Sequence, residues 1–188
     1  ATQAHRQPGS AFKPFVYAVA LERGLPMNHL LVDHPGDFNG YRPENFKGEY
    51  WGTVTLKFAL TRSLNTASVR LLRYVGVDAA IEMAQRLGIS TLLLPDDRNL
   101  ALVLGGLTKG VTPLEMTAAY AVFANGGFYN KPYAIEKVYD ARGRLIFRHR
   151  AHPRRVLSEE VAYLMTNMLQ SVVEYGTGTA ANIGRPQA

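Results

Sequence analysis

Ser10 and Lys13 lie three positions apart, a spacing that puts both side chains on one face of a helix, one turn apart. Pro8-Gly9, just before the serine, is typical of a tight turn that exposes the hydroxyl at a helix start. A lysine amine in this position can take the hydroxyl proton, which turns the serine into a nucleophile for carbonyl carbons. The pair therefore predicts covalent catalysis through an acyl-enzyme.

Ser63 and Asn65 form the only Ser-x-Asn of the chain, about fifty residues after the only Ser-x-x-Lys. Ser63 could relay a proton between Lys13 and a leaving amine. The Asn65 amide could hold a substrate backbone or fix Lys13 by hydrogen bonds. Helix capping with a solvated lysine explains either motif alone, because serine and asparagine are common caps. The two motifs together, in this order, favour catalysis.

The flanks of both motifs make the chain similar to the transpeptidase domain of class A penicillin-binding proteins. Ser-x-x-Lys followed by Ser-x-Asn is also the order found in active-site serine penicilloyl enzymes. The similarity extends through essentially the whole chain. The segments that carry it are ATQA at 1–4, RQPGS at 6–10, YRPEN at 41–45, YWGTVTL at 50–56, ALTRSLN at 59–65, LGGLTKGVTPLE at 104–115 and ANGG at 124–127.

This resemblance implies the α+β fold shared by penicillin-binding transpeptidases and serine β-lactamases. It assigns Ser10 as the nucleophile, Lys13 as its base, Ser63 as the proton relay and Asn65 as a catalytic and substrate-binding amide. It also suggests a substrate-binding role for Thr177. The backbone N–H of Ser10, near a helix start, would supply half of an oxyanion hole.

The family completes its site with a Lys-Thr-Gly strand, and this chain contains no Lys-Thr-Gly. In the family, two strands precede the nucleophile helix and three more carry or follow that motif. We therefore expect residues 1–188 to be one partial transpeptidase domain, dominated by helices, with one β-hairpin and most of the central sheet missing. We expect the isolated fragment to be inactive.

The resemblance also names the reaction and its setting. The implied enzyme is a D,D-transpeptidase that cross-links the D-Ala-D-Ala stem peptides of peptidoglycan and is acylated by β-lactams at the same serine. It needs no metal or organic cofactor. The parent protein would be anchored in the bacterial cytoplasmic membrane, with this domain on the extracytoplasmic side and a glycosyltransferase domain upstream.

The amino-acid composition limits the classes of function that the chain can have. The 188 residues are 47% hydrophobic, which is enough for one core, and no apolar run reaches the roughly twenty residues that cross a bilayer. Zero cysteines exclude disulfides and thiolate chemistry. The charge of +6 accompanies no nucleic-acid motif, and six arginines crowd into residues 142–155. We interpret that stretch as a solvated hairpin, with contact to a membrane surface or an anionic polymer as the functional alternative.

Local signals divide the chain into helices joined by loops. We expect a long loop over residues 25–53 that lines a substrate groove, and a hairpin whose strands are 133–140 and 144–148. Without its sheet, the nucleophile helix should leave Phe12, Phe15 and Val16 short of packing partners. The expected helices are 10–23, 54–61, 65–74, one capped by Asp78 that ends before 88, 113–125, and one capped by Ser158 that runs to 174.

Three other functions compete with transpeptidation. A serine β-lactamase shares both motifs but hydrolyses its acyl-enzyme quickly, and the loop that carries its added glutamate base is not evident after Asn65. A non-catalytic β-lactam sensor or scaffold would bind without turnover. A basic binding module would show salt-dependent binding to an anionic polymer.

Overall fold

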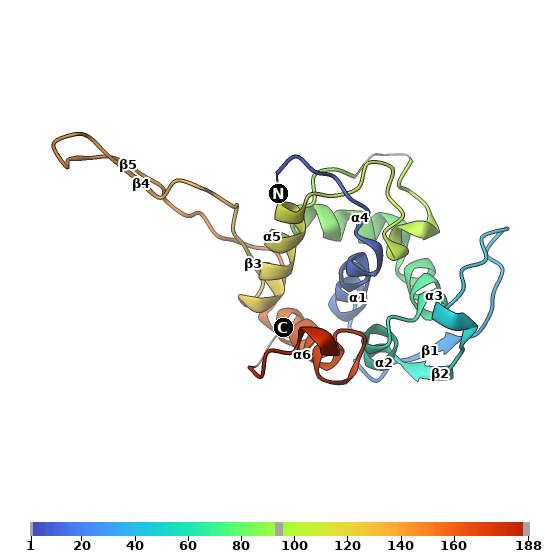
Figure 1. Cartoon of the computed structure of the whole chain (residues 1–188). Helices are drawn as coiled ribbons and strands as arrows, with labels where there is room; N and C mark the ends of the chain where they lie inside the picture. The colour runs from blue at the N-terminus through green and yellow to red at the C-terminus, as the bar shows by residue number, and fades with distance from the viewer. Residues whose placement is uncertain (1, 93–95, 186–188) are drawn as a thin grey trace.

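The structure is a computed structural model, which describes residues 2–92 and 96–185 (Figure 1). Within these ranges the chain is rich in helix, and its strands form three separate antiparallel pairs. In chain order the elements are η1 (Gly9–Phe12), α1 (Lys13–Glu22), β1 (Leu30–Asp33), η2 (Phe46–Gly48), β2 (Gly52–Thr55), α2 (Leu56–Thr61), α3 (Asn65–Val75), α4 (Val77–Arg86), η3 (Leu100–Leu104), α5 (Pro113–Ala124), β3 (Phe128–Tyr129), β4 (Lys137–Tyr139), β5 (Leu145–Arg148), β6 (Arg154–Arg155), α6 (Glu159–Tyr175) and η4 (Thr179–Ala181), where η denotes a 3-10 helix.

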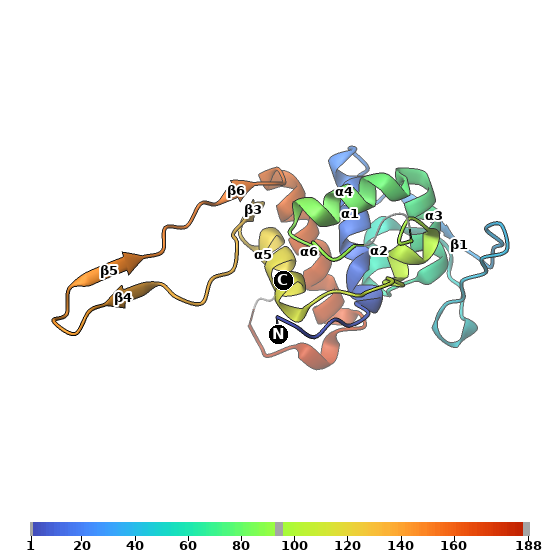
Figure 2. The same ribbon diagram turned by 90° about the horizontal axis from the view of Figure 1, so that it is seen from above.

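Helix α1 runs through the middle of the molecule and is surrounded by other helices (Figures 1 and 2). Its sequence is apolar on all sides between Lys13 and Glu22, a pattern typical of a helix buried in a core. It packs against α2, α3, α4 and α6. In the described ranges no helix is both long and apolar enough to cross a membrane.

The expectation that the nucleophile helix would lack packing partners is wrong. Phe12, Phe15 and Val16 are all fully buried. The Phe15 ring packs edge-on against Phe12, at 5.0 Å between ring centroids, and lies 6.1 Å from the ring of Tyr120 on α5. The helices that follow α1 in the chain therefore cover it without the family's central sheet.

Side-chain hydrogen bonds cap the starts of several helices. The Thr112 hydroxyl accepts from the Glu115 backbone N–H at 3.2 Å, and the Glu115 carboxylate accepts from the Thr112 N–H at 3.0 Å, which completes a capping box at α5. Ser158 caps α6. Asp78, by contrast, lies in the first turn of α4, and Gly76 precedes that helix.

The segment predicted as a loop over residues 25–53 contains the first strand and half of the second. β1 pairs with β2 in antiparallel register, from Leu30 opposite Thr55 to Asp33 opposite Gly52. Because residues 54 and 55 belong to β2, α2 starts at Leu56 rather than at 54. Together with the β3–β6 pair, these strands make three pairs where one hairpin was expected.

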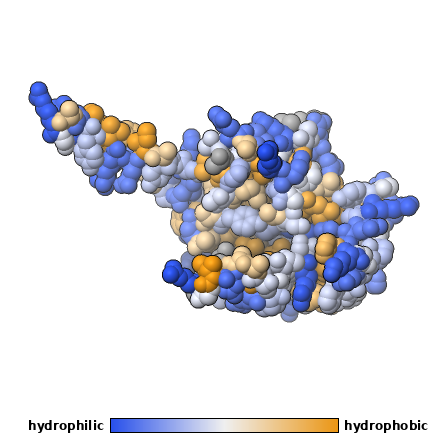
Figure 3. Space-filling model, in the orientation of Figure 1, coloured by the Kyte–Doolittle hydropathy of each residue, from blue (hydrophilic) through white to orange (hydrophobic). Residues whose placement is uncertain are grey.

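The predicted hairpin is present as β4 and β5, at the end of an arm formed by residues 130–155 (Figures 1 and 2). All residues of both strands are exposed, and hydrophobic residues form a band along the arm with hydrophilic residues beside it (Figure 3). The arm carries eight of the 21 lysines and arginines and two of the 15 acidic residues. Its excess of six positive charges thus equals the net charge of the whole chain.

Replacement of Phe15 by alanine tests whether α1 is packed as described. We expect Phe15→Ala to lower the free energy of unfolding by about 3–5 kcal/mol, because a large buried ring leaves a cavity. Phe46→Ala is the matched control, since that ring is 84% exposed, and it should change stability by less than about 0.5 kcal/mol. Denaturant titration of the 188-residue chain measures both. Equal losses for the two variants would contradict the packing.

Candidate active site

The turn before Ser10 positions the candidate nucleophile at the entrance to α1. Gly9 adopts a left-handed conformation with φ of +57°, and Ser10 follows within η1 with its side chain exposed. Helical geometry continues through Lys13, with φ of −50° and ψ of −44°. Pro14 does not disturb it, because a proline in the first turn of a helix removes an N–H that has no intrahelical partner. The predicted helical path from Ser10 to Lys13 is confirmed.

Lys13 is the point where the four predicted catalytic residues meet. Its Nζ lies 2.8 Å from Ser10 Oγ and 2.8 Å from Asn65 Oδ1. It also lies 3.0 Å from Ser63 Oγ and 2.9 Å from the Ser63 carbonyl oxygen. An ammonium has three protons for these four oxygens, whereas a neutral amine has a lone pair that can accept a hydroxyl proton. The expected convergence of these side chains is present.

Burial changes the acid–base behaviour of this lysine. Lys13 is fully buried, and among the described residues none of the ion pairs involves it. Desolvation of the ammonium lowers the pKa of Lys13 from 10.5 to about 7. A substantial fraction of the amine is therefore neutral near pH 7, and only the neutral form can remove a proton from Ser10.

Ser63 reaches Lys13 through an unusual backbone conformation between α2 and α3. Its φ is +54°, in the left-handed region, which costs a residue with a side chain about 1–2 kcal/mol. The turn is held by hydrogen bonds from the Ser63 N–H to Leu60 O at 2.9 Å and from the Leu64 N–H to Ala59 O at 2.9 Å. This conformation lets both the hydroxyl and the carbonyl of Ser63 face the amine.

Asn65 is the first residue of α3, and its side-chain amide is fixed from both ends. The Nδ2 group donates to the Glu44 carbonyl at 2.7 Å, so the Oδ1 atom faces Lys13. Glu44 belongs to the segment between β1 and β2. That segment therefore takes part in orienting the side chain of Asn65 towards Lys13.

Hydrogen bonds hold the turn around Gly9 against residues 105–111: the contacts are those of Gln7 with Leu107 and of Arg6 with Val111. Gln7 accepts from the Leu107 N–H at 2.8 Å with its Oε1 atom and donates to the Leu107 carbonyl with its Nε2 group. A Cβ atom on Gly105 would lie only 2.3 Å from the Gly9 nitrogen. Only glycine allows this close approach, which explains part of the LGGLTKG stretch.

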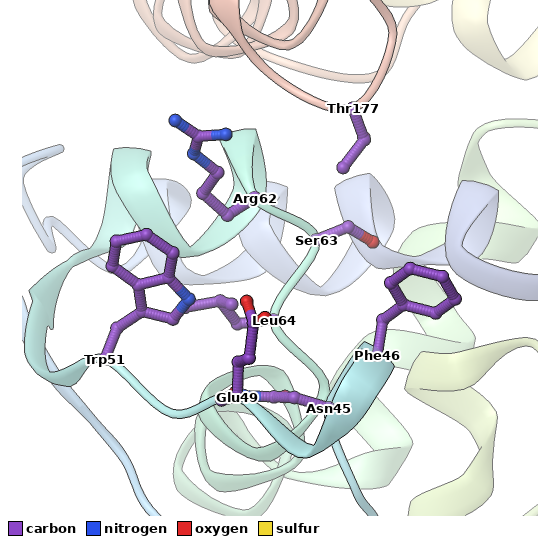
Figure 4. A pocket seen from close by; sticks show the side chains of 8 residues that line it. All are labelled: Asn45, Phe46, Glu49, Trp51, Arg62, Ser63, Leu64 and Thr177. Carbon is purple, nitrogen blue, oxygen red and sulfur yellow. The ribbon is translucent and has the colours of Figure 1, made fainter.

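A groove runs past Ser10 and Ser63 and continues beyond them. Ser10, Ser63 and Thr177 all line its first part, with Leu60 and Tyr120 among the walls. Ser63 and Thr177 also line the second part, where the Thr177 side chain points towards Ser63 (Figure 4). Thr177 thus lines the groove beside Ser63, and its backbone N–H donates to the Thr61 carbonyl at 3.2 Å. The remaining walls of the second part are Asn45, Phe46, Glu49, Trp51, Arg62 and Leu64.

Sequence reasoning missed Tyr120, Asp33 and Asn45. Tyr120 lines the groove, and its hydroxyl donates to the Ala11 carbonyl at 2.7 Å; burial raises the pKa of Tyr120 above its usual value. Asp33 and Asn45 form a buried network next to Asn65. Their positions follow from contacts between distant segments, so no local pattern could have indicated them. In the described ranges no group of three or more histidine, aspartate and glutamate residues could hold a metal ion.

Comparison with protein families matches residues 1–187 to the family described as "Penicillin binding protein transpeptidase domain". Similar proteins include penicillin-binding protein 1A of Neisseria lactamica, 39% identical over 98% of this chain and 24% of that protein. Penicillin-binding protein 1F of Bacillus subtilis is 40% identical over 93% of this chain and 24% of its own length. The chain thus spans about a quarter of the length of these relatives.

Solved structures show the same relationship. Penicillin-binding protein 1A from Haemophilus influenzae superposes with a TM-score of 0.87 and 31% identity, over 96% of this chain and 32% of that one. PonA1 from Mycobacterium tuberculosis, in complex with penicillin V, superposes with a TM-score of 0.82 and 28% identity, over 92% of this chain and 49% of that one. The chain belongs to the family of penicillin-binding protein transpeptidase domains, of the class A type.

The lowered pKa of Lys13 predicts how stability depends on pH. Between about pH 7 and 10.5 the unfolded chain holds a proton on this amine that the folded chain lacks, so stability should rise with pH by up to about 1.4 kcal/mol per unit. The rise should be lost in Lys13→Met and kept in Lys109→Met, whose lysine is exposed. Unfolding titrations at several pH values measure it. A Lys13→Met variant with the same pH dependence as the parent would refute the shift.

Proposed function

We propose that this chain provides the nucleophile and the proton-transfer groups of a peptidoglycan D,D-transpeptidase. The observation that carries the proposal is the contact of 2.8 Å between Ser10 Oγ and the buried Nζ of Lys13. Membership of the family supplies the substrate class: stem peptides that end in D-Ala-D-Ala. Because the chain spans only part of its relatives, the activity is proposed for the complete gene product.

The acylation step uses the groups around Lys13 in sequence. Neutral Lys13 removes the Ser10 hydroxyl proton while Oγ bonds to the carbonyl carbon of the penultimate D-alanine. The negative charge that develops on the carbonyl oxygen is stabilised by the Ser10 backbone N–H and by a second donor outside this chain. Ser63 passes the proton from Lys13 to the amine of the terminal D-alanine, which leaves as the peptide bond breaks.

Transfer to the acceptor repeats these steps in reverse. An amine from a neighbouring stem peptide enters the groove, loses a proton through Ser63 to Lys13, and attacks the ester carbonyl. The ester bond breaks, a new amide forms, and Ser10 regains its proton from Lys13. Asn65 keeps the amine of Lys13 in place throughout and offers an amide to the substrate backbone, and Thr177 binds substrate from the opposite side of the groove.

A β-lactam would enter the same acylation step, since its ring amide presents a carbonyl to Ser10. In this case the leaving nitrogen stays tethered to the acyl group. We also propose, from the class A relatives, that the complete gene product is anchored on the extracytoplasmic face of the cytoplasmic membrane and carries a glycosyltransferase domain before this segment.

Acylation by a fluorescent penicillin tests the proposal. Mass spectrometry of the complete gene product should find the adduct on the Ser10 peptide. The acylation rate should increase with pH through about 7, because raising the pH produces the neutral Lys13 that acts as base. Lys13→Arg should abolish acylation, since a guanidinium stays protonated, while Lys109→Arg should leave it unchanged. An adduct on another residue would disprove the assignment, and rapid release of hydrolysed penicillin would indicate a β-lactamase.

A second experiment tests the expectation that residues 1–188 are inactive alone. The isolated chain should transfer a D-Ala-D-Ala peptide about a hundred to a thousand times more slowly than the complete gene product, because one oxyanion donor comes from the Lys-Thr-Gly strand. The rate of D-alanine release by both proteins measures this. Comparable rates would show that the strand is dispensable.

A further inference from the structure

Asp33 is a buried acid for which the proposed chemistry has no direct use. It is the last residue of β1 and is fully buried, and its carboxylate accepts several hydrogen bonds. Asn45 Nδ2 donates to both carboxylate oxygens, at 2.8 and 2.9 Å, and the Trp51 N–H donates at 2.9 Å. The Thr66 hydroxyl donates as well. A buried carboxylate with this many donors orients the groups that bind it.

Asn45 is the group whose orientation Asp33 determines. Its Nδ2 faces the carboxylate and also donates to the Glu49 carbonyl at 3.0 Å, so its Oδ1 must point the other way. There it accepts from the backbone N–H of Asn65 at 2.7 Å and of Thr66 at 3.2 Å. These are the first two N–H groups of α3, which have no partner inside the helix.

Asn45 therefore caps α3 from a distance of twenty residues in the chain. Leu64, which occupies the N-cap position, has no side chain that can do this. The cap holds the first turn of α3, and with it the backbone of Asn65, against β1. The side chain of Asn65 then contacts Lys13 Nζ at 2.8 Å.

We propose that Asp33 and Asn45 are positioning residues of the active site, which place Asn65 against Lys13 by capping α3 from the segment between β1 and β2. The inference rests on the proposed acylation of Ser10 and adds two residues outside the groups that react. Its consequence is that a neutral, isosteric change at Asp33 slows acylation although the residue touches no substrate.

The experiment measures penicillin acylation in the complete gene product. Asp33→Asn places an amide N–H₂ against that of Asn45, and we expect the rate constant at saturating penicillin to fall about tenfold to a hundredfold, because shifts of about 1 Å at a reacting group have effects of this size. The half-saturating concentration should stay within about twofold. Asp37→Asn is the matched control, an exposed aspartate of the segment between β1 and β2 that pairs with Arg42, and it should leave both quantities unchanged.

A reciprocal exchange separates positioning from general loss of structure. The double variant Asp33→Asn with Asn45→Asp restores one donor and one carboxylate between the two positions, so it should recover at least about tenfold of the lost rate. Unchanged acylation in Asp33→Asn would overturn the inference, and so would a double variant that acylates no faster than Asp33→Asn. Failure of the unsubstituted protein to acylate Ser10 would instead overturn the proposed function.

Discussion

The active site depends on one physical constraint: an amine must be kept out of water with only neutral oxygens around it. Lys13 meets this constraint because it starts a helix that is buried on every side. A carboxylate beside it would stabilise the ammonium and remove its ability to act as a base. The oxygens that surround it come from η1, from the turn before α3 and from α3 itself. The packing of α1 therefore also determines the environment of the amine that we propose as the base for Ser10.

The two sides of the site are held by different means. On one side, backbone meets backbone: the turn at Gly9 lies against Gly105, and the Arg6 and Val111 N–H groups donate to each other's carbonyls at 3.0 and 2.9 Å. On the other side, the buried side chain of Asn45, from the segment between β1 and β2, holds the start of α3. Close backbone contact thus positions Ser10, the proposed nucleophile, whereas a polar network positions Asn65 against Lys13.

Features that local chemistry determines could be predicted from sequence. The cap at Ser158 and the Ser10–Lys13 pair each depend on residues a few positions apart. The β1–β2 pair could not be predicted, because its strands are short and lie about twenty residues apart. The burial of Phe15 also depends on α5, a hundred residues away. The cap that Asn45 provides for α3 could not be predicted either, because it joins residues twenty positions apart.

The arm of residues 130–155 gives the molecule an uneven electric field. Outside it, thirteen basic and thirteen acidic residues cancel, so the helical body is formally neutral while the projecting hairpin carries the excess charge. Salt screens exposed charges over about 8 Å at physiological ionic strength. The arm would attract a polyanion, whereas the rest of the chain has no net formal charge to do so. The net positive charge of the chain is therefore displaced to one end, in a segment that takes no part in the core, and an anionic surface would orient the molecule through the arm.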